Sequence, residues 1–268
     1  MNLVDKRLLV TGVTGTLGER VAKRFGNEGA EVRVLIRDDK QASRLSDLGI
    51  TPIIGDLANQ ASLKEALTNC NCVIHCAAYL GDDWNLAKDS NITGVENLAS
   101  LSLEAGVQKF IHISTLSVYG HPAEGDLDET SPIVLKHEHA YPETKAESER
   151  ILDRYKERGL CVTTLRPGAI CAEENSYWGD RQVTRMLATD VVNWVHPDDL
   201  VPWVHTDNLV EMIHLVSVKD VCGEVYNAID GNYPEQEFRV KLISALGKKL
   251  CVPERAIERP FYSNTKIK

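Results

Sequence analysis

The first half of the chain alternates short apolar, β-branched runs with segments that have the helical period. Such alternation predicts parallel strands joined by crossover helices that cover both faces of one sheet. The expected strands are Arg7–Thr11, Glu31–Ile36, Thr51–Ile54, Cys72–Cys76, Lys109–Ile113 and Cys161–Leu165. The expected helices are Leu17–Asn27, Asp39–Leu48, Ala61–Thr68, Trp84–Ala105 and one that carries Tyr141 and Lys145. The pattern therefore predicts an α/β fold with a doubly wound parallel (Rossmann) sheet.

The pattern weakens toward the C-terminus. Only three further elements are expected: helices at Thr206–Val218 and Glu235–Leu246, and a strand at Glu224–Ala228. We expect residues 1–168 to form a dinucleotide-binding domain that includes the catalytic helix. Residues 169–268 are expected to form mostly a small C-terminal substrate-binding cap, with segments returning to the Rossmann sheet. Such a cap would cover the carboxyl ends of the strands, where ligands of open α/β sheets bind.

Charge and composition narrow the choice of partners. The 268 residues carry a net charge of −9, which argues against a nucleic-acid partner because phosphate backbones favour basic surfaces. The N-terminal sequence lacks the features of a signal peptide, and no run approaches the ~18 apolar residues of a membrane span. A cytoplasmic location without a membrane partner is the expectation, and the seven cysteines agree with it.

Three cysteines and a histidine cluster within residues 70–76. Cys70, Cys72, His75 and Cys76 include two types of zinc ligand. No second ligand pair follows at the spacing of a zinc finger. We therefore interpret Cys72–Cys76 as a strand whose thiols act as small apolar groups, and we expect no metal.

A glycine-rich segment follows the first strand and opens the first helix. Gly12, Gly15 and Gly18 lie at three-residue intervals in the run Thr11-Gly-Val-Thr-Gly-Thr-Leu-Gly18. Glycine permits close backbone approach, and a helix N-terminus presents free N–H groups to a pyrophosphate. The glycines could instead serve only a tight turn. The strand that follows favours the dinucleotide interpretation.

The end of the second strand bears on the choice between NAD and NADP. Arg37 stands about where an acidic residue would bind the ribose 2′-hydroxyl of NAD. Its planar guanidinium can instead pair with a 2′-phosphate, which favours NADP. Asp38 beside it keeps NAD as the alternative. Asp56, after the third strand, could accept a hydrogen bond from an adenine amino group or cap the next helix.

Tyr141 and Lys145 are one helical turn apart. A phenol of pKa ~10 exchanges protons poorly at neutral pH. An ammonium one turn away favours the phenolate and is expected to lower that pKa. Tyrosine and lysine also meet at this spacing on many surface helices. The nucleotide loop and the hydroxyl-rich strand end at Ser114–Ser117 favour a site for hydride and proton transfer.

Eight motifs in order resemble the extended short-chain dehydrogenase/reductase family over nearly the whole chain. The first is Thr-Gly-x-x-Gly-x-x-Gly at 11–18, followed by Gly-Asp-Leu at 55–57, His-Cys-Ala-Ala at 75–78 and Asn-Ile-Thr-Gly at 91–94. Ile-Ser-Thr-Leu-Ser-Val-Tyr-Gly at 113–120 precedes Tyr-x-x-x-Lys, and Leu-Arg-Pro-Gly at 165–168 and Trp-Val-His-Thr-Asp-Asn-Leu at 203–209 follow it. The motifs around Tyr141 and Arg166 look most like those of the 3-beta-hydroxysteroid dehydrogenase and ketoreductase-like branch.

The resemblance implies a role for each catalytic position. Tyr141 would be the general acid/base, and Lys145 would bind the ribose hydroxyls and shift the pKa of the tyrosine. Thr115 would hydrogen-bond the substrate oxygen, with Ser114 and Ser117 as nearby alternatives. Asn91 would lie behind the site, or serve only as a helix residue satisfied by its neighbours.

The resemblance also implies a cofactor path. Ala77 and Ala78 would let the dinucleotide pass the fourth strand, and Pro167 and Gly168 would approach the nicotinamide. The expected cofactor-binding residues are Gly12, Thr14, Gly15, Thr16, Leu17, Gly18, Arg37, Asp56, Leu57, Ala77, Ala78, Tyr141, Lys145, Pro167, Gly168 and Ile170.

These residues together predict an NAD(P)-dependent oxidoreductase that acts on a secondary alcohol or ketone, with NADP preferred. A nucleotide-sugar epimerase would use the same residues. Sugar dehydration is not expected, because Leu116 and Ser117 stand where sugar 4,6-dehydratases have an Asp-Glu pair that acts as acid and base. The family's aromatic-Gly-Pro turn is replaced by residues 171–175, which keeps a non-catalytic NADP-binding redox regulator as an alternative.

Two further expectations concern surfaces. The resemblance suggests a homodimer formed through the helices at 84–105 and 140–155. Trp178, Trp194 and Trp203 of the cap region could line an apolar pocket or pack in a core or interface.

Overall fold

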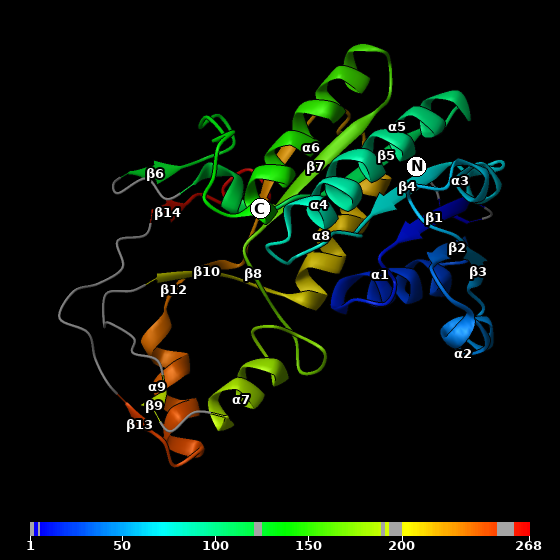
Figure 1. The fold of residues 1–268 in the computed structure, drawn as a ribbon. Coiled ribbons are helices and arrows are strands. Elements are labelled where there is room, and N and C mark those ends of the chain that lie inside the picture. Colours follow the sequence, from blue (N-terminus) through cyan, green and yellow to red (C-terminus); the bar gives the residue numbers. More distant parts are fainter. Residues whose placement is uncertain (1–2, 5, 121–124, 189–190, 193–199, 251–259) are drawn as a thin grey trace.

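A seven-stranded parallel sheet forms the centre of the molecule (Figure 1). The computed structural model describes residues 3–4, 6–120, 125–188, 191–192, 200–250 and 260–268. The strand order is β11-β7-β5-β4-β1-β2-β3. These strands are β1 (Arg7–Thr11), β2 (Glu31–Ile36), β3 (Thr51–Ile54), β4 (Cys72–His75), β5 (Lys109–Ile113), β7 (Val162–Pro167) and β11 (Val225–Ala228). The order reverses between β1 and β4, so the carboxyl ends of these two strands flank the crevice in which α/β folds bind ligands.

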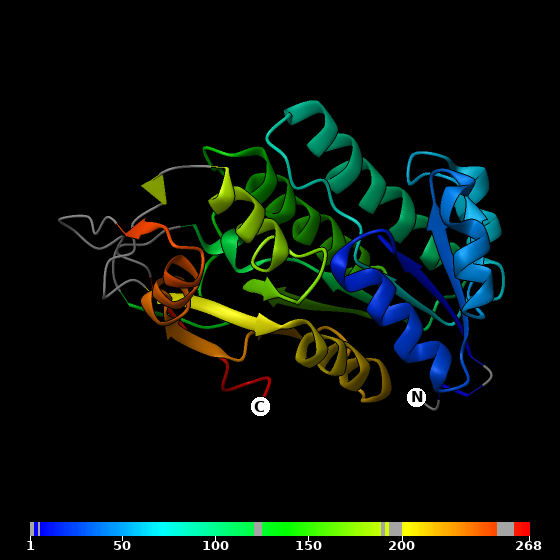
Figure 2. The ribbon, with the colours of Figure 1, turned by 90° about the horizontal axis from the view of Figure 1, so that it is seen from below.

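Helices cover both faces of this sheet (Figure 2). In β1, Leu8 and Val10 pack into one core cluster and Leu9 into the other, because successive side chains of a strand point to opposite faces. The first cluster includes α1 (Thr16–Asn27) and α8 (Thr206–Val218). The second includes α3 (Gln60–Leu67), α5 (Gly94–Glu104) and α6 (Ala140–Glu157). The predicted doubly wound α/β fold is confirmed.

The structure refines several predicted elements. The expected helix at 84–105 consists of α4 (Trp84–Lys88), a π-helical segment η2 (Asp89–Thr93) and α5. The expected helix at 39–48 begins as a 3₁₀ turn, η1 (Asp39–Gln41), before α2 (Ala42–Asp47). The expected loop at 114–139 contains a 3₁₀ turn, η3 (Leu116–Tyr119), and the short strand β6 (Asp126–Leu127). The strand expected at 161–165 extends from Val162 to Pro167.

The C-terminal part contains strands that the sequence pattern did not predict. β8 (Ala169–Cys171), β10 (Leu200–His205) and β12 (Gly231–Pro234) form a three-stranded sheet. Helices α7 (Asp180–Leu187) and α9 (Glu235–Ala245) pack together through Met186 and Ile243. The remaining strands are β9 (Val191–Val192), β13 (Lys249–Leu250) and β14 (Phe261–Tyr262). Two later segments return to the main sheet: α8 contacts α1, and β11 is one of the strands of the sheet. The boundary between the two expected domains at residue 168 stays a prediction.

Two glycines of the nucleotide loop are required by backbone packing. Gly12 has φ +74°, and a Cβ there would lie 2.6 Å from the backbone nitrogen of Ala77. A Cβ on Gly18 would lie 2.4 Å from the carbonyl oxygen of Gly12. Glycine at these positions lets the β1–α1 turn lie directly against the end of β4.

Alanine substitutions at Gly18 and Gly26 should have opposite effects on stability. Both glycines lie in α1, but a Cβ on Gly26 would meet no atom within 4 Å. We expect Gly26→Ala to raise the free energy of unfolding by about 0.5–1 kcal/mol through helix propensity. Gly18→Ala should lower it by roughly 1–3 kcal/mol through overpacking. Urea denaturation of both variants checks this, and equal stabilities would contradict the packing argument.

Candidate functional site

The helix that carries Tyr141 and Lys145 begins over the carboxyl end of the sheet. Helix α6 starts at Ala140, whose backbone N–H donates to the Asp82 carboxylate at 2.8 Å. His139, before the helix, pairs with the same carboxylate at 3.0 Å. Asp82 follows β4, so the loop after β4 fixes the first turn of α6. Tyr141 lies in that turn, which suits the early helix position of its Pro142 neighbour.

Tyr141 lies beside Thr115, whose hydroxyl influences the pKa of the phenol. Thr115 follows β5 and is 7% exposed, and its hydroxyl donates to Ser117 Oγ at 3.2 Å. Burial raises the pKa of Tyr141 to about 12, although the Thr115 hydroxyl opposes the shift. The phenol therefore keeps its proton at neutral pH. This geometry suits a proton donor to a substrate oxygen.

Lys145 is almost fully buried one turn further along α6. Its side chain is 1% exposed, and Nζ donates to the Ile113 carbonyl at 2.7 Å and lies 3.2 Å from His112 Nε2. Burial lowers its pKa from 10.5 to about 8, against the attraction of Glu149. The sequence argument expected Lys145 to lower the pKa of Tyr141. In this structure burial instead raises the pKa of the Tyr141 phenol. The Lys145 ammonium is directed to the Ile113 carbonyl and to His112.

Asn91 occupies the π-helical segment η2, and its side chain is fully hydrogen-bonded. Its amide nitrogen donates to the Tyr79 carbonyl and to Thr144 Oγ1, each at 3.0 Å. Its oxygen accepts from the Tyr79 N–H at 2.8 Å. Asn91 therefore ties the loop after β4 to α6. These hydrogen bonds are enough to explain why the polar side chain of Asn91 is buried. Its catalytic role stays a prediction.

A second buried polar network lies beside the first and was missed from the sequence. Arg166 of β7 and Glu149 of α6 form an ion pair at 2.7 Å, each side chain 6% exposed. Ser114 donates to the same carboxylate. Arg166 also donates to Tyr119 Oη at 2.7 Å. The Ser114 hydroxyl is directed to the Glu149 carboxylate, whereas the Thr115 hydroxyl lies beside Tyr141.

The nucleotide loop has the geometry of an anion site. Gly15 precedes α1 without any side-chain cap on the helix N-terminus. Thr14 and Gly15 are exposed, while Leu17 and Gly18 are buried. A Cβ on Gly15 would approach only the Gly12 carbonyl, at 3.4 Å. The first-turn N–H groups of this twelve-residue helix therefore remain available to a pyrophosphate.

The strand ends beside this loop also suit a dinucleotide. Thr11 Oγ1 accepts from the Ala77 N–H at 3.2 Å, which holds the chain after β4 close to the loop. Ala77 and Ala78 are half-buried, and their short side chains leave the backbone accessible. Thr16 Oγ1 donates to the Asn175 carbonyl, so the loop after β8 contacts the nucleotide loop.

The predicted adenosine-side residues lie at the ends of β2 and β3. Arg37 is exposed, and within the described part of the chain it has no recorded hydrogen bond or ion pair. Asp38 instead accepts from the Lys40 N–H at 3.1 Å. Asp56 accepts from the Ala58 N–H at 2.9 Å and does not cap α3. Asn59 is that cap, so the capping alternative for Asp56 was wrong.

Leu57 and three residues of the 167–170 segment support the backbone around the site. Leu57 is buried, and a Cβ on Gly94 would lie 2.9 Å from its side chain. Pro167 ends β7, and a Cβ on Gly168 would lie 2.0 Å from the Pro202 carbonyl oxygen. Gly168 thus permits β8 to approach β10. Ile170 lies in β8, half-buried.

Among the cysteines, Cys70 and Cys72 are buried, with Cys72 in the core as expected. Within the described residues, no group of three or more His, Cys, Asp or Glu side chains could hold a metal ion. Cys161 and Cys222, 61 residues apart in the sequence, lie side by side with Cα atoms 5.1 Å apart, a proximity that the sequence did not reveal. Of the described helices, none has the length and apolarity to cross a membrane.

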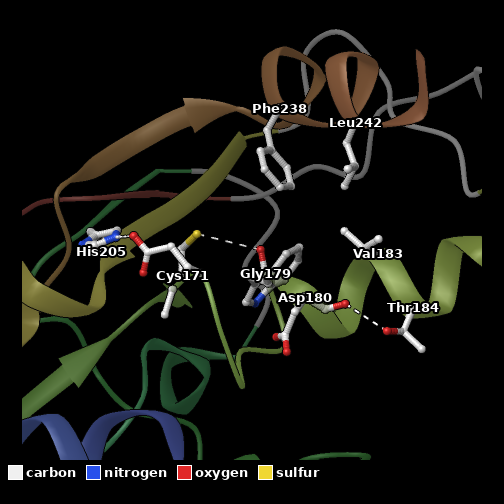
Figure 3. A pocket seen from close by; sticks show the side chains of 11 residues that line it. Cys171, Gly179, Asp180, Val183, Thr184, His205, Phe238 and Leu242 are labelled. Atoms are coloured by element: carbon white, nitrogen blue, oxygen red, sulfur yellow. Dashed lines mark hydrogen bonds and ion pairs between the residues drawn. The ribbon is translucent and has the colours of Figure 1, made fainter. Parts of the chain in front are cut away.

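A pocket of about 640 Å³ lies in the C-terminal part, beyond β8 (Figure 3). Its lining includes Trp178, Val183, His205, Phe238 and Leu242. Thr115, Tyr141 and Lys145 are not among its lining residues. Trp178 thus lines a pocket as one alternative foresaw, while Trp194 lies outside the described residues.

Comparison with known proteins places these features in context. A family model described as "NAD dependent epimerase/dehydratase family" matches residues 8–228. A 4-hydroxy-2-methyl-3-oxo-4-farnesyl-3,4-dihydroquinoline-1-oxide ketoreductase of Stigmatella aurantiaca is 28% identical over 91% of this chain and 74% of its own length. A 3-beta-hydroxysteroid dehydrogenase of Mycolicibacterium neoaurum is 27% identical over 69% of this chain and 52% of its own length.

Solved structures agree in fold. A dTDP-glucose 4,6-dehydratase from Streptomyces venezuelae, with NAD bound, superposes with a TM-score of 0.81. It is 23% identical, and the match covers 97% of this chain and 89% of that one. The chain thus spans most of this structure, about three quarters of the ketoreductase and about half of the steroid dehydrogenase.

Replacing Lys145 by methionine should stabilise the fold in a pH-dependent way. The folded state holds the ammonium at a pKa of about 8 against 10.5, a cost on the order of 3 kcal/mol at neutral pH. Lost hydrogen bonds offset part of it, so we expect Lys145→Met to raise the free energy of unfolding by roughly 1–3 kcal/mol at pH 7.

This gain should shrink as pH rises from about 8 to about 10. Over that window the unfolded wild type binds more protons than the folded one, so wild-type stability rises with pH. Urea denaturation across this range checks the slope, with Lys64→Met, at an exposed position of α3, as the control. A gain that stays constant with pH would show that burial of the charge is not its source.

Proposed function

Because the chain belongs to the NAD-dependent epimerase/dehydratase family, we propose that it is an oxidoreductase of the extended short-chain type. The family and the enzyme class are those predicted from the sequence. In our proposal the enzyme moves a hydride between a nicotinamide and a secondary alcohol or ketone. The observation that carries it is the placement of Tyr141 beside Thr115 at the end of β5, one helical turn from buried Lys145. The nucleotide loop follows β1 of the same parallel sheet.

The proposed chemistry assigns each residue a distinct task. A bound nicotinamide would supply or accept the hydride. Tyr141 gives its proton to the oxygen of the ketone as the alcohol forms, or takes it back in the reverse direction. Thr115 hydrogen-bonds the same oxygen and orients it toward the phenol. Lys145 adds positive charge beneath the site, which stabilises the phenolate left after proton transfer.

Tyr141→Phe should remove turnover without removing cofactor binding. Phenylalanine keeps the ring but has no proton to give, so we expect kcat for ketone reduction to fall by roughly 10²–10⁴-fold. The dissociation constant for NADPH should change by less than about threefold, since a single neutral hydrogen bond contributes modestly. Steady-state NADPH oxidation over a ketone panel and fluorescence titration measure the two quantities.

The matched control is Tyr155→Phe, a buried tyrosine at the far end of α6. It should leave kcat near that of the wild type. Undiminished turnover by Tyr141→Phe would overturn the assigned role. Nucleotide that stays bound through purification, together with turnover of a nucleotide sugar, would favour an epimerase. Cofactor binding without turnover of any carbonyl or alcohol would favour a redox regulator.

We further propose NADP as the preferred cofactor. Arg37 is exposed at the end of β2, and the neighbouring Asp38 is engaged with the Lys40 backbone. A guanidinium in this position can make charge-assisted hydrogen bonds to a 2′-phosphate, which NAD lacks. The family description supports an NAD-type cofactor in general. The preference for the phosphate form rests on Arg37.

Arg37→Ala should weaken NADP selectively. Loss of one charged hydrogen-bonding partner is expected to raise the dissociation constant for NADPH roughly tenfold to a hundredfold. The constant for NADH should change by less than about threefold, because NADH carries no 2′-phosphate. Calorimetric titration with both cofactors tests this, with Lys23→Ala on α1 as a charge-matched control. An equal loss for both cofactors would refute recognition of the 2′-phosphate by Arg37.

A homodimer and a cytoplasmic location complete the proposal. Trp84 and Leu86 of α4 are 38% and 52% exposed, an apolar surface on one of the helices expected at the interface. Burial of such side chains favours association. The cytoplasmic assignment rests on the sequence alone.

A further inference from the structure

The pocket beyond β8 has walls of apolar and aromatic side chains. Figure 3 shows Phe238 and Leu242 projecting from α9 on one side, with Val183 of α7 opposite. Trp178 comes from the loop before α7. A volume of about 640 Å³ is in the range of sites for small organic molecules. The pocket can therefore hold a group of several rings.

The aromatic walls are fixed by contacts with one another. Trp203 of β10 packs edge to face against Trp178 and Phe238, with ring centroids 5.3 Å apart in both pairs. Tyr177 extends the row with a further edge contact to Trp178, at 5.5 Å. Such pairs stabilise defined ring orientations. A flat apolar group would meet a preformed surface and cause little rearrangement.

The charges around the pocket disfavour an anionic ligand. The acidic lining residues are Glu173 and Asp180, and His205 Nε2 lies 3.7 Å from Glu173. None of the described lining residues is a lysine or an arginine.

The nearby arginines of α7 have other partners. Arg185 lies 3.6 Å from the centre of the Tyr177 ring, and Arg181 donates to Asn175. Among the described lining residues, a diphosphate would therefore meet acidic side chains without a lysine or arginine partner, which costs binding free energy.

One residue that lines the pocket directly follows, in the sequence, a residue of the proposed cofactor path. Cys171, one of its lining residues, follows Ile170 at the end of β8. The loop that carries Trp178 also contacts the nucleotide loop, because Asn175 accepts from Thr16. A substrate whose carbonyl reaches Tyr141 could thus place a remote part in this pocket.

We propose that the pocket beyond β8 binds an uncharged, ring-containing apolar arm of the ketone substrate. This inference rests on the proposed function and narrows its substrate class, separating it from nucleotide sugars. His205, with a pairing carboxylate beside it, offers one polar contact at the edge of an otherwise apolar group. Trp178, Phe238 and Leu242 provide the binding surface.

Two methyl ketones that differ only in the arm test this proposal. We expect wild-type kcat/KM with NADPH to be at least about tenfold higher for a naphthyl-substituted butanone than for butanone, from burial of the ring system. Phe238→Ala and Leu242→Asp should each reduce this ratio to within about threefold of one. Tyr233→Ala, an exposed aromatic of β12 outside the lining, is the matched control. Uridine diphosphate should not compete with the naphthyl ketone.

The proposal can also be tested without turnover. Calorimetry measures binding of the naphthyl-substituted butanol, the alcohol that corresponds to the naphthyl ketone. Equal kcat/KM for both ketones would overturn the pocket while leaving the proposed function intact. Binding of the alcohol that depends on Phe238 and Leu242, without reduction of either ketone, would support the pocket and overturn the function. Absence of both binding and turnover, or competition by uridine diphosphate, would overturn the pocket. Thermal denaturation of each variant identifies loss of folding.

Discussion

The burial of one ammonium group organises the candidate site. Lys145 is held against the sheet by the Ile113 carbonyl, and His112 lies behind it. Burial keeps the pKa of His112 well below its ordinary value and lowers that of His75, stacked on it at 5.6 Å, to about 3. Both imidazoles are therefore neutral at neutral pH and add no like charge. Burial of the Lys145 cation lowers the free energy of unfolding. Its position beside Tyr141 offers a functional reason why a lysine is buried there.

Helix α6 is thereby fixed to the sheet by directional polar contacts as well as by apolar packing. Lys145 joins it to β5, and Glu149, one turn later, joins it to β7 through Arg166. Tyr119 extends this second contact to Asn227 of β11, at 2.8 Å. Apolar packing has little directional preference. These polar contacts, in contrast, fix the rotation of α6 about its axis and its position along that axis. Tyr141 consequently meets Thr115 at the end of β5.

The sequence predicted most of the main sheet, because its strands are apolar on both faces and its helices are long and periodic. It did not predict β8, β10 or β12, because β8 has only three residues and the other two contain Pro202 and Pro234. It named Thr115, Tyr141 and Lys145 from motifs. It missed Glu149, Arg166 and the Cys161–Cys222 pair because each contact joins residues far apart in the chain. The sequence also did not show that burial would raise the pKa of Tyr141, because burial depends on the assembled fold.

In the proposed reaction, Tyr141 and a nicotinamide together reduce a carbonyl carbon at the edge of this sheet. The most direct measurement follows deuterium from the transferable position of the NADPH nicotinamide into the product, by mass spectrometry. We expect one deuterium on the carbinol carbon of the alcohol product, with stoichiometric loss from the cofactor. Recovery of fully labelled NADPH with unlabelled alcohol, or with no alcohol from any ketone, would contradict the proposed reaction.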